Sequence, residues 1–349
     1  MPRKDNRMKY SVDVGRMHEM LSRRVVGQCA AVEAVIDAYQ IFRSGLANPD
    51  RPLGSFLFLG PTGTGKTNLV EAFADVCFCN RHAMLKVDCA EFSHSHEISK
   101  LIGSPPGYLG HSETTPYFSA TNITRYHTLS SPFTLVLFDE IEKAHDTLWH
   151  LLLGILDTAR LTLGNNSEVN FSNCFIFMTS NVGARAVAGA LGEHIGFQGN
   201  APDSPDELQT RVERIVHNAA RKTFSPEFLN RIDRQVVFHR LEQAHLEQIL
   251  ALELAKVKER ICRKIPGFVL EVNDEARAWF VENGTDYALG ARPLKRLLEQ
   301  TLVMPIARMI SEGEIQQSSK AYVGIEWDRI DVRSGVATPK KAKAASAAF

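Results

Sequence analysis

The eight residues GPTGTGKT, Gly60 to Thr67, constrain the fold of this chain more than any other feature. They match the pattern G-x-x-x-x-G-K-[ST], in which a glycine-rich turn and the start of a helix surround phosphate groups with backbone N–H groups. The apolar run that ends RPLGSFLFLG (51–60) predicts a buried strand before the turn, and NLVEAFADVCF predicts a helix after it. This context favours a phosphate-binding loop over a chance glycine-rich turn.

The loop predicts a nucleotide site with a bound divalent cation. Lys66 would neutralise charge on the β- and γ-phosphates of ATP, and the Thr67 hydroxyl would bind Mg²⁺. We expect the nucleotide to contact all the residues of the loop, namely Gly60, Pro61, Thr62, Gly63, Thr64, Gly65, Lys66 and Thr67.

A second motif, FTLVLFDE (133–140), supplies two carboxylates at the end of another predicted buried strand. Asp139 can hold Mg²⁺ through the water shell of the metal, and Glu140 can orient and deprotonate a water that attacks the γ-phosphate. A lone Asp-Glu pair is usually a solvated surface pair. At a buried strand end beyond a phosphate loop it predicts ATP hydrolysis rather than binding alone.

The order of predicted elements indicates an α/β fold. Buried strands at 51–60, 133–140 and 174–180 alternate with helical segments, which predicts a parallel sheet covered by helices on both faces. From Leu246 onward, apolar residues recur at helical spacing, which predicts a small, mostly helical second domain ending in a strand or hairpin at AYVGIEWDRIDV. We therefore expect a leader at 1–24, a large domain at 25–236, a small domain at 237–335 and a disordered tail at 336–349.

The charge balance and the cysteines limit the possible partners. Lys+Arg and Asp+Glu both number 40, which argues against a dedicated nucleic-acid protein. No apolar run approaches the roughly 18 residues that a membrane helix needs. The six cysteines are scattered, a pattern typical of reduced thiols, so we expect a cytoplasmic protein without membrane or nucleic-acid partners.

Seven blocks, in the right order, resemble the Clp family of AAA+ ATPases, in particular the second ATPase ring of ClpA, ClpB and ClpC. The resemblance covers about residues 20–335 and implies an AAA+ P-loop fold followed by a small C-terminal lid domain. The blocks are RVVGQ (24–28), RPLGSFLFLGPTGTGKT (51–67), LIGSPPGYLG (101–110), LFDEIEKAH (137–145), MTSNVGA (178–184), FSPEFLNRID (224–233) and GARPLKR (290–296).

The resemblance implies roles for five further residues. Val25 and Val26 would line the adenine pocket, and Asn181 would be the first sensor, which helps to position the attacking water. Arg231 would be the arginine finger, which in this family reaches the nucleotide of the neighbouring subunit, and Arg292 would be the second sensor. A finger that acts on a neighbour implies a homo-oligomeric ring, expected to be a hexamer.

The block GSPPGYLGH resembles the pore loop with which Clp proteins grip an unfolded polypeptide. An aromatic side chain between glycines can press on any residue of a substrate, although a tyrosine in a tight turn is the simpler interpretation. The chain departs from the family in the longer segment 111–133, which lacks a basic cluster, and at 164–168, in place of a second pore-facing loop. The expected pore-loop residues are Gly107, Tyr108, Leu109 and Gly110.

The tripeptide Ile195, Gly196 and Phe197 lies where ClpA and ClpC carry the loop that docks on a protease ring. It resembles that loop, and the alternative is an apolar pair that caps the core of the large domain. Docking would make this chain the ATPase partner of a ClpP-like protease.

We therefore expect an ATP-driven ring that unfolds or remodels proteins by threading them through a pore, as a single-ring machine or with a separate adaptor. Its alternatives are the motor of a ClpP-like protease and a regulatory ATPase that acts without threading, which the divergent segment 111–133 leaves open. A remodeller of nucleic-acid or transcription complexes has little support, because the chain has no zinc cluster and no strong basic stripe.

Overall fold

A computed structural model describes residues 12–104, 115–192, 205–285, 290–316 and 319–336 of the chain. The chain divides into two compact units, Met1–Arg240 and Leu241–Phe349, and each is described by itself. Of the tail expected at 336–349, Val336 is the last residue of β10 and residues 337–349 lie outside the described residues.

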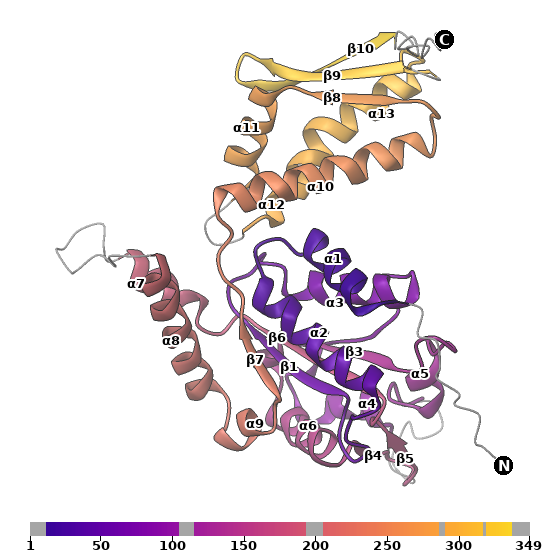
Figure 1. Ribbon diagram of the computed structural model, residues 1–349, viewed down its shortest axis with the longest axis vertical. Helices are drawn as coiled ribbons and strands as arrows, with labels where there is room; N and C mark the ends of the chain where they lie inside the picture. Colours follow the sequence, from indigo (N-terminus) through magenta and orange to yellow (C-terminus); the bar gives the residue numbers. More distant parts are fainter. Residues whose placement is uncertain (1–11, 105–114, 193–204, 286–289, 317–318, 337–349) are drawn as a thin grey trace, which may run out of the picture. The chain divides into compact units, whose positions relative to one another are not determined.

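The first unit is built on a five-stranded sheet with the strand order β2-β3-β6-β1-β7 (Figure 1). Every neighbouring pair of strands is parallel, so all five carboxyl ends meet at one edge of the sheet. The strands are β1 (Gly54–Leu59), β2 (Leu85–Asp88), β3 (Thr134–Asp139), β6 (Cys174–Ser180) and β7 (Arg234–Val237). The predicted parallel α/β sheet is confirmed.

Helices cover this sheet, and a small hairpin of β4 (Arg160–Thr162) and β5 (Glu168–Asn170) lies beside it. Helix α1, at the end of the expected leader, packs into the unit, because its Met17 and Leu21 side chains are fully buried. The helices are α1 (Val14–Arg24), α2 (Cys29–Ser44), α3 (Lys66–Phe78), α4 (Ser99–Ile102), α5 (Ala120–Thr124), α6 (Asp146–Thr158), α7 (Ala184–Gly192), α8 (Pro205–Thr223) and α9 (Pro226–Asn230).

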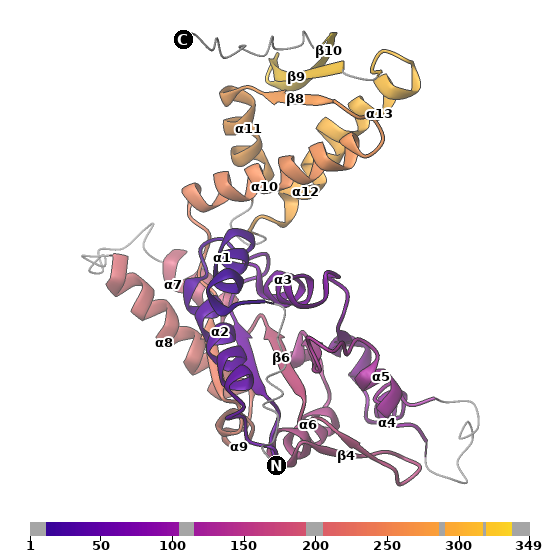
Figure 2. The same cartoon turned by 45° about the vertical axis from the view of Figure 1, so that its right-hand side comes forward.

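The strands read as continuous apolar runs because both faces of the sheet are buried. Phe56 and Phe58 of β1 pack with helices α1, α2 and α3 on one face, where Phe56 stacks on Phe177 at 5.0 Å between ring centroids. Leu57 and Leu59 point to the other face and pack with α6, α8 and α9 (Figures 1 and 2). Because successive side chains of β1 point to opposite faces of the sheet, this one strand contributes to two separate hydrophobic cores.

The second unit combines helices with a three-stranded sheet in the order β10-β9-β8. The strand or hairpin expected near its end is the antiparallel pair β9 (Ser319–Glu326) and β10 (Arg329–Val336), and β8 (Val269–Val272), which the sequence analysis did not predict, adds to β9 in parallel. Its helical elements are α10 (Gln243–Cys262), α11 (Asp274–Gly284), α12 (Arg292–Leu298), a π-helical turn at Glu299–Val303 and α13 (Met304–Ser311).

Candidate nucleotide site

The phosphate loop connects the carboxyl end of β1 to the first residue of α3. Its first glycine, Gly60, has φ 137° and lies against the backbone of Phe238, whose carbonyl oxygen would be only 2.5 Å from an added Cβ atom. Only glycine fits both this dihedral angle and this close approach. The loop is therefore backed by the chain segment that leaves β7.

Lys66 is almost fully buried, with 7% of its surface exposed, and its ammonium group is compensated by oxygen atoms. Its Nζ atom donates to the carbonyl oxygens of Gly60 and Pro61, each at 2.7 Å, and to Oδ1 of Asn181 at 2.9 Å. Burying a charged group is costly unless polar partners of this kind surround it. Phosphate oxygens entering the loop would take the place of these carbonyls.

Asp139, at the end of β3, lies beside Thr67 of the phosphate loop. The Thr67 hydroxyl donates to Oδ1 of Asp139 at 3.2 Å, and Thr179 donates to the same oxygen. Nζ of Lys86, on β2, is 2.7 Å from the other oxygen, Oδ2. Burial alone would raise the pKa of Asp139, but the bonds from Lys86, Thr179 and Thr67 outweigh it and hold the pKa below its ordinary value. The carboxylate is therefore ionised at neutral pH.

A hydroxyl and an ionised carboxylate side by side are hard oxygen ligands of the kind that Mg²⁺ prefers. The donor set of Thr67 and Asp139 fits a magnesium ion that keeps several of its waters and bridges to nucleotide phosphates.

Glu140 adopts a left-handed conformation, with φ 59° and ψ 49°, at the point where the chain leaves β3. Such a conformation is costly for a residue with a side chain, and residues held in it concentrate at functional sites. Its backbone N–H donates to the Thr179 hydroxyl at 3.1 Å, while its carboxylate accepts from Nδ2 of Asn181 at 3.3 Å and pairs with Lys143. Asn181 thus contacts both Lys66 and Glu140.

The segment expected to line the adenine pocket lies beside the phosphate loop. Val25 and Val26 are buried, and the Arg24 carbonyl just before them accepts a hydrogen bond from Asn68 of α3. Gln28, at the start of α2, donates to the carbonyls of Thr64, in the loop, at 3.3 Å and of His239 at 2.9 Å. It also accepts from the His239 N–H at 3.1 Å, so one buried amide joins three segments of the unit.

Arg231 lies at the opposite end of β1 from the phosphate loop. It precedes β7, whose Arg234 pairs with Phe56 near the start of β1, and Asp233 accepts from the Ser55 N–H at 2.8 Å. Strand β1 has six residues and so spans roughly 20 Å between this end and the loop. Within one chain, Arg231 is therefore remote from Lys66.

The remaining predicted site residues fall elsewhere. Arg292 is the first residue of α12, exposed and within the second unit. The expected pore-loop residues 107–110 and docking residues 195–197 lie outside the described residues. The divergent segment 111–133 is described from residue 115 and includes α5, and residues 164–168 belong to the β4–β5 hairpin.

Four residues at the site were not singled out from the sequence: Gln28, Lys86, Lys143 and Thr179. Gln28 and Thr179 lie inside the quoted blocks RVVGQ and MTSNVGA, so their motifs were found without their contacts. Lys143 lies three residues after Glu140 in LFDEIEKAH. Lys86 had no comparable signal, because only the pairing of β2 with β3 brings it to Asp139.

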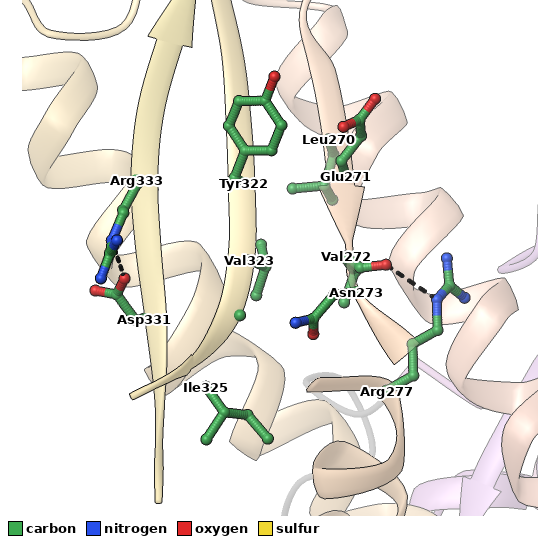
Figure 3. A pocket seen from close by; sticks show the side chains of 11 residues that line it. Leu270, Glu271, Val272, Asn273, Arg277, Tyr322, Val323, Ile325, Asp331 and Arg333 are labelled. Atoms are coloured by element: carbon green, nitrogen blue, oxygen red, sulfur yellow. Dashed lines mark hydrogen bonds and ion pairs between the residues drawn. The ribbon is translucent and has the colours of Figure 1, made fainter. Parts of the chain in front are cut away.

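A groove of about 590 Å³ lies on the second unit, along β8, β9 and β10 (Figure 3). Two of its arginines bond to other residues of its lining: Arg333 Nε donates to Asp331 at 2.5 Å, and Arg277 Nε donates to the Val272 carbonyl at 3.3 Å. It contains none of the residues singled out from the sequence. Over the described ranges, the structure holds neither a group of three or more metal-ligating side chains nor a helix long and apolar enough to cross a bilayer.

Two protein families match consecutive parts of the chain. Residues 51–235 match the AAA domain (Cdc48 subfamily), and residues 241–323 match the C-terminal, D2-small domain of ClpB protein. The first match covers four strands of the sheet and the start of β7, and the second covers most of the second unit.

Individual relatives agree with these families. The chain is 40% identical over 312 residues to the chaperone protein ClpB of Rhodopseudomonas palustris, covering 89% of this chain and 33% of that protein. It is 38% identical over 311 residues to ClpB of Vibrio cholerae, covering 89% and 34%. The chain thus spans about a third of the length of these relatives.

Two solved structures match most of this chain. A complex of S. cerevisiae Hsp104 with casein, in an extended conformation, matches with a TM-score of 0.77 and 32% identity, over 95% of this chain and 53% of that one. A closed-state cryo-EM reconstruction of Hsp104 with ATPγS and FITC casein matches with a TM-score of 0.75 and 34% identity, over 91% and 51%.

Proposed function

We propose that this chain, which belongs to the Clp family of AAA+ ATPases, is an ATP-hydrolysing ring subunit that unfolds or remodels proteins by drawing them through a central pore. The observation that carries the ATPase part is the contact series at the carboxyl edge of the sheet. There Lys66 contacts Asn181, Asn181 contacts Glu140, and Thr67 contacts Asp139.

The chemistry follows from these side chains. Lys66, freed from the loop carbonyls, would bind the phosphates of ATP. Thr67 and Asp139 would hold Mg²⁺, which would neutralise charge on the phosphates. Glu140, oriented by Asn181, takes a proton from the attacking water. Val25 and Val26 are proposed to face the adenine, and Arg292 is proposed as the second sensor.

The position of Arg231 supports the proposed assembly of several copies. Because it lies at the far end of β1 from its own phosphate loop, a role in catalysis requires that it act on the nucleotide of another copy. Each active site then combines Lys66, Asp139 and Glu140 of one chain with Arg231 of its neighbour. We propose a hexamer, in keeping with the resemblance stated above.

The substrate is proposed to be an unfolded polypeptide. The similar Hsp104 structures contain casein, and the match covers more than nine tenths of this chain. Tyr108, on the segment 107–110, is the residue proposed to grip the polypeptide. A ClpP-like protease docked at residues 195–197, an adaptor chain and a cytoplasmic location remain predictions from the sequence.

The test is ATP-dependent unfolding of a stable, tagged fluorescent protein, monitored as loss of its fluorescence. The chain should unfold it with ATP, and Tyr108→Ala should lose unfolding while keeping ATP hydrolysis. Hydrolysis without unfolding by the unaltered chain would instead favour a regulatory ATPase. Electron microscopy of Glu140→Gln with ATP should show rings with a chain in the pore, and a monomer with bound ATP would contradict the assembly.

Docking on a protease has a separate readout. Ile195→Ala combined with Phe197→Ala should leave unfolding intact and abolish stimulation of a ClpP-like peptidase. If the unaltered chain does not stimulate the peptidase, the result favours a remodeller that acts without a protease.

A further inference from the structure

The backbone that carries Arg231 is fixed by a second arginine. Nη2 of Arg51 donates to the Arg231 carbonyl at 3.2 Å, and its Nε donates to the Leu156 carbonyl, near the end of α6, at 3.3 Å. Two residues further on, the Asp233 N–H donates to Oγ of Ser55 at 2.9 Å. The start of β1, the end of α6 and the residues before β7 are therefore joined, which leaves the Arg231 side chain as the part that can move.

That side chain is held by two carboxylates of its own chain. Nη1 of Arg231 forms an ion pair with Asp157, the residue after Leu156 on α6. Nη2 donates to Oε1 of Glu227, one turn earlier in α9, at 3.0 Å. The Arg231 side chain is 28% exposed, whereas those of Asp157 and Glu227 are 41% and 60% exposed, so this cluster can be approached from outside.

The charges of this cluster oppose the role proposed for Arg231. Two carboxylates around one guanidinium leave a net negative charge, which repels the phosphate of a neighbouring nucleotide. A guanidinium has five N–H donors, but a bidentate grip on phosphate needs two adjacent ones on the same side. Because Asp157 pairs with Nη1 and Glu227 with Nη2, a phosphate that approaches either Nη atom competes with a carboxylate for it.

From this geometry we propose that Asp157 and Glu227 are positioning residues that store the Arg231 guanidinium on its own subunit until a neighbour's nucleotide displaces them. The ion pairs keep the side chain ordered in the separate chain. They also make ATP hydrolysis depend more steeply on assembly, since each finger gives up two partners to reach the γ-phosphate. The proposal rests on the function proposed for Arg231.

The experiment measures the ATP hydrolysis rate of the full chain against protein concentration. In the double variant Asp157→Asn, Glu227→Gln, the charge that holds Arg231 is gone while the shapes of the side chains remain. The protein concentration for half-maximal rate should fall about three- to fivefold, the size expected from removing two partly exposed ion pairs. The maximal rate should not fall.

Matched variants distinguish loss of the charges that hold Arg231 from a general structural effect. Asp157→Glu, made alone, keeps the negative charge and should show the same concentration dependence as the unaltered chain. Glu259, in α10, forms a similar ion pair at 2.8 Å with Arg263, one helical turn later. Glu259→Gln removes this pair and should leave the concentration dependence unchanged. Glu227→Gln alone alters only an exposed side chain, so its shift can be measured even if changes at Asp157 impair folding.

Each outcome bears on one proposal. If the double variant lowers the maximal rate or needs more protein, the carboxylates orient a productive finger and the storage role is wrong. An unchanged concentration dependence would also overturn it. Arg231→Ala tests the proposed function separately: normal hydrolysis by that variant would remove Arg231 from the active site, whatever Asp157 and Glu227 do.

Discussion

The two ends of strand β1 carry different kinds of polar contact. At the carboxyl end, Lys66 is buried and contacts Asn181, and Thr67 contacts Asp139, so the groups that would meet one nucleotide also meet one another. At the amino end, the polar side chains fix the backbone around Arg231 and pair its partly exposed guanidinium with surface carboxylates.

This difference indicates which parts of the site are complete in a single chain. The phosphate and magnesium groups are assembled by the fold itself, because parallel strands bring their ends to one edge. Arg231 is anchored at its backbone, and Lys66, Thr67, Asp139 and Glu140 lie at the opposite edge of the sheet. If Arg231 acts on the nucleotide of another copy, as proposed, the two ends should respond differently to substitution.

The largest expected effect comes from mixing two inactive variants. Lys66→Ala should not bind ATP and Arg231→Ala should bind without hydrolysis, each lowering the rate about 10³-fold or more. Mixed rings should regain hydrolysis, because Arg231 of one chain meets the intact nucleotide site of the other. The measurement is the steady-state ATPase rate against the mixing ratio.

The matched control mixes Lys66→Ala with Glu140→Gln. Both changes affect the carboxyl edge of the sheet, Lys66 after β1 and Glu140 after β3, so no pairing of these chains yields a complete site and the rate should stay low. If the ATPase rate recovers equally in both mixtures, or recovers in neither, the proposed division between the two ends of β1 is wrong.

A smaller effect is expected on stability at the amino end. Asp233→Ala removes the acceptor of the Ser55 N–H at 2.8 Å and of its hydroxyl at 2.7 Å, and Ser55 is buried. Leaving these donors without a partner should lower the free energy of unfolding by about 1–3 kcal/mol, measured by urea unfolding. ATP affinity should be retained, because the substitution is remote from the phosphate loop.

The comparison variant for stability is Asp75→Ala, which loses a partly exposed pair with Arg24 at 2.6 Å. It should cost less than about 1 kcal/mol. An equal loss in the two variants would mean that the contacts around Arg231 are no more important than an ordinary surface pair.

The smallest effect is expected at the carboxyl end, from Lys86→Met. Lys86 pairs with the oxygen of Asp139 that Thr67 does not contact, and its positive charge opposes a bound Mg²⁺. Removing the charge should lower the Mg²⁺ concentration for half-maximal hydrolysis about two- to fivefold, as expected for a partly exposed pair. Lys86→Arg should leave it unchanged, and a higher Mg²⁺ requirement in Lys86→Met would show that Lys86 supports the site.

The sequence predicted the local parts of the fold well and the long-range contacts poorly. Strand β1 ends at Leu59 and α3 begins at Lys66, where the phosphate-loop motif places them, because turn and helix signals are local. Strand β8 was missed because it has four residues and forms by pairing with β9, with Val269 opposite Lys320. Such pairing depends on the rest of the unit rather than on local propensity.

The same distinction holds for the site. Motifs identified Lys66, Asp139 and Asn181, and the structure brings them to one edge of the sheet. They could not reveal Lys86, whose approach to Asp139 depends on the register of β2 against β3, with Lys86 opposite Leu137. Nor could they reveal Asp157 beside Arg231, which requires the end of α6 to lie against the start of β7.

The separation of Lys66 and Arg231 along β1 also sets how many active sites an assembly can have. If Arg231 acts only on a neighbour, a lone chain has none, and a row of chains with two free ends has one fewer than its number of chains. Only a closed assembly gives every chain a complete site. Loss of a single interface would then silence one site without any change in the residues that form it.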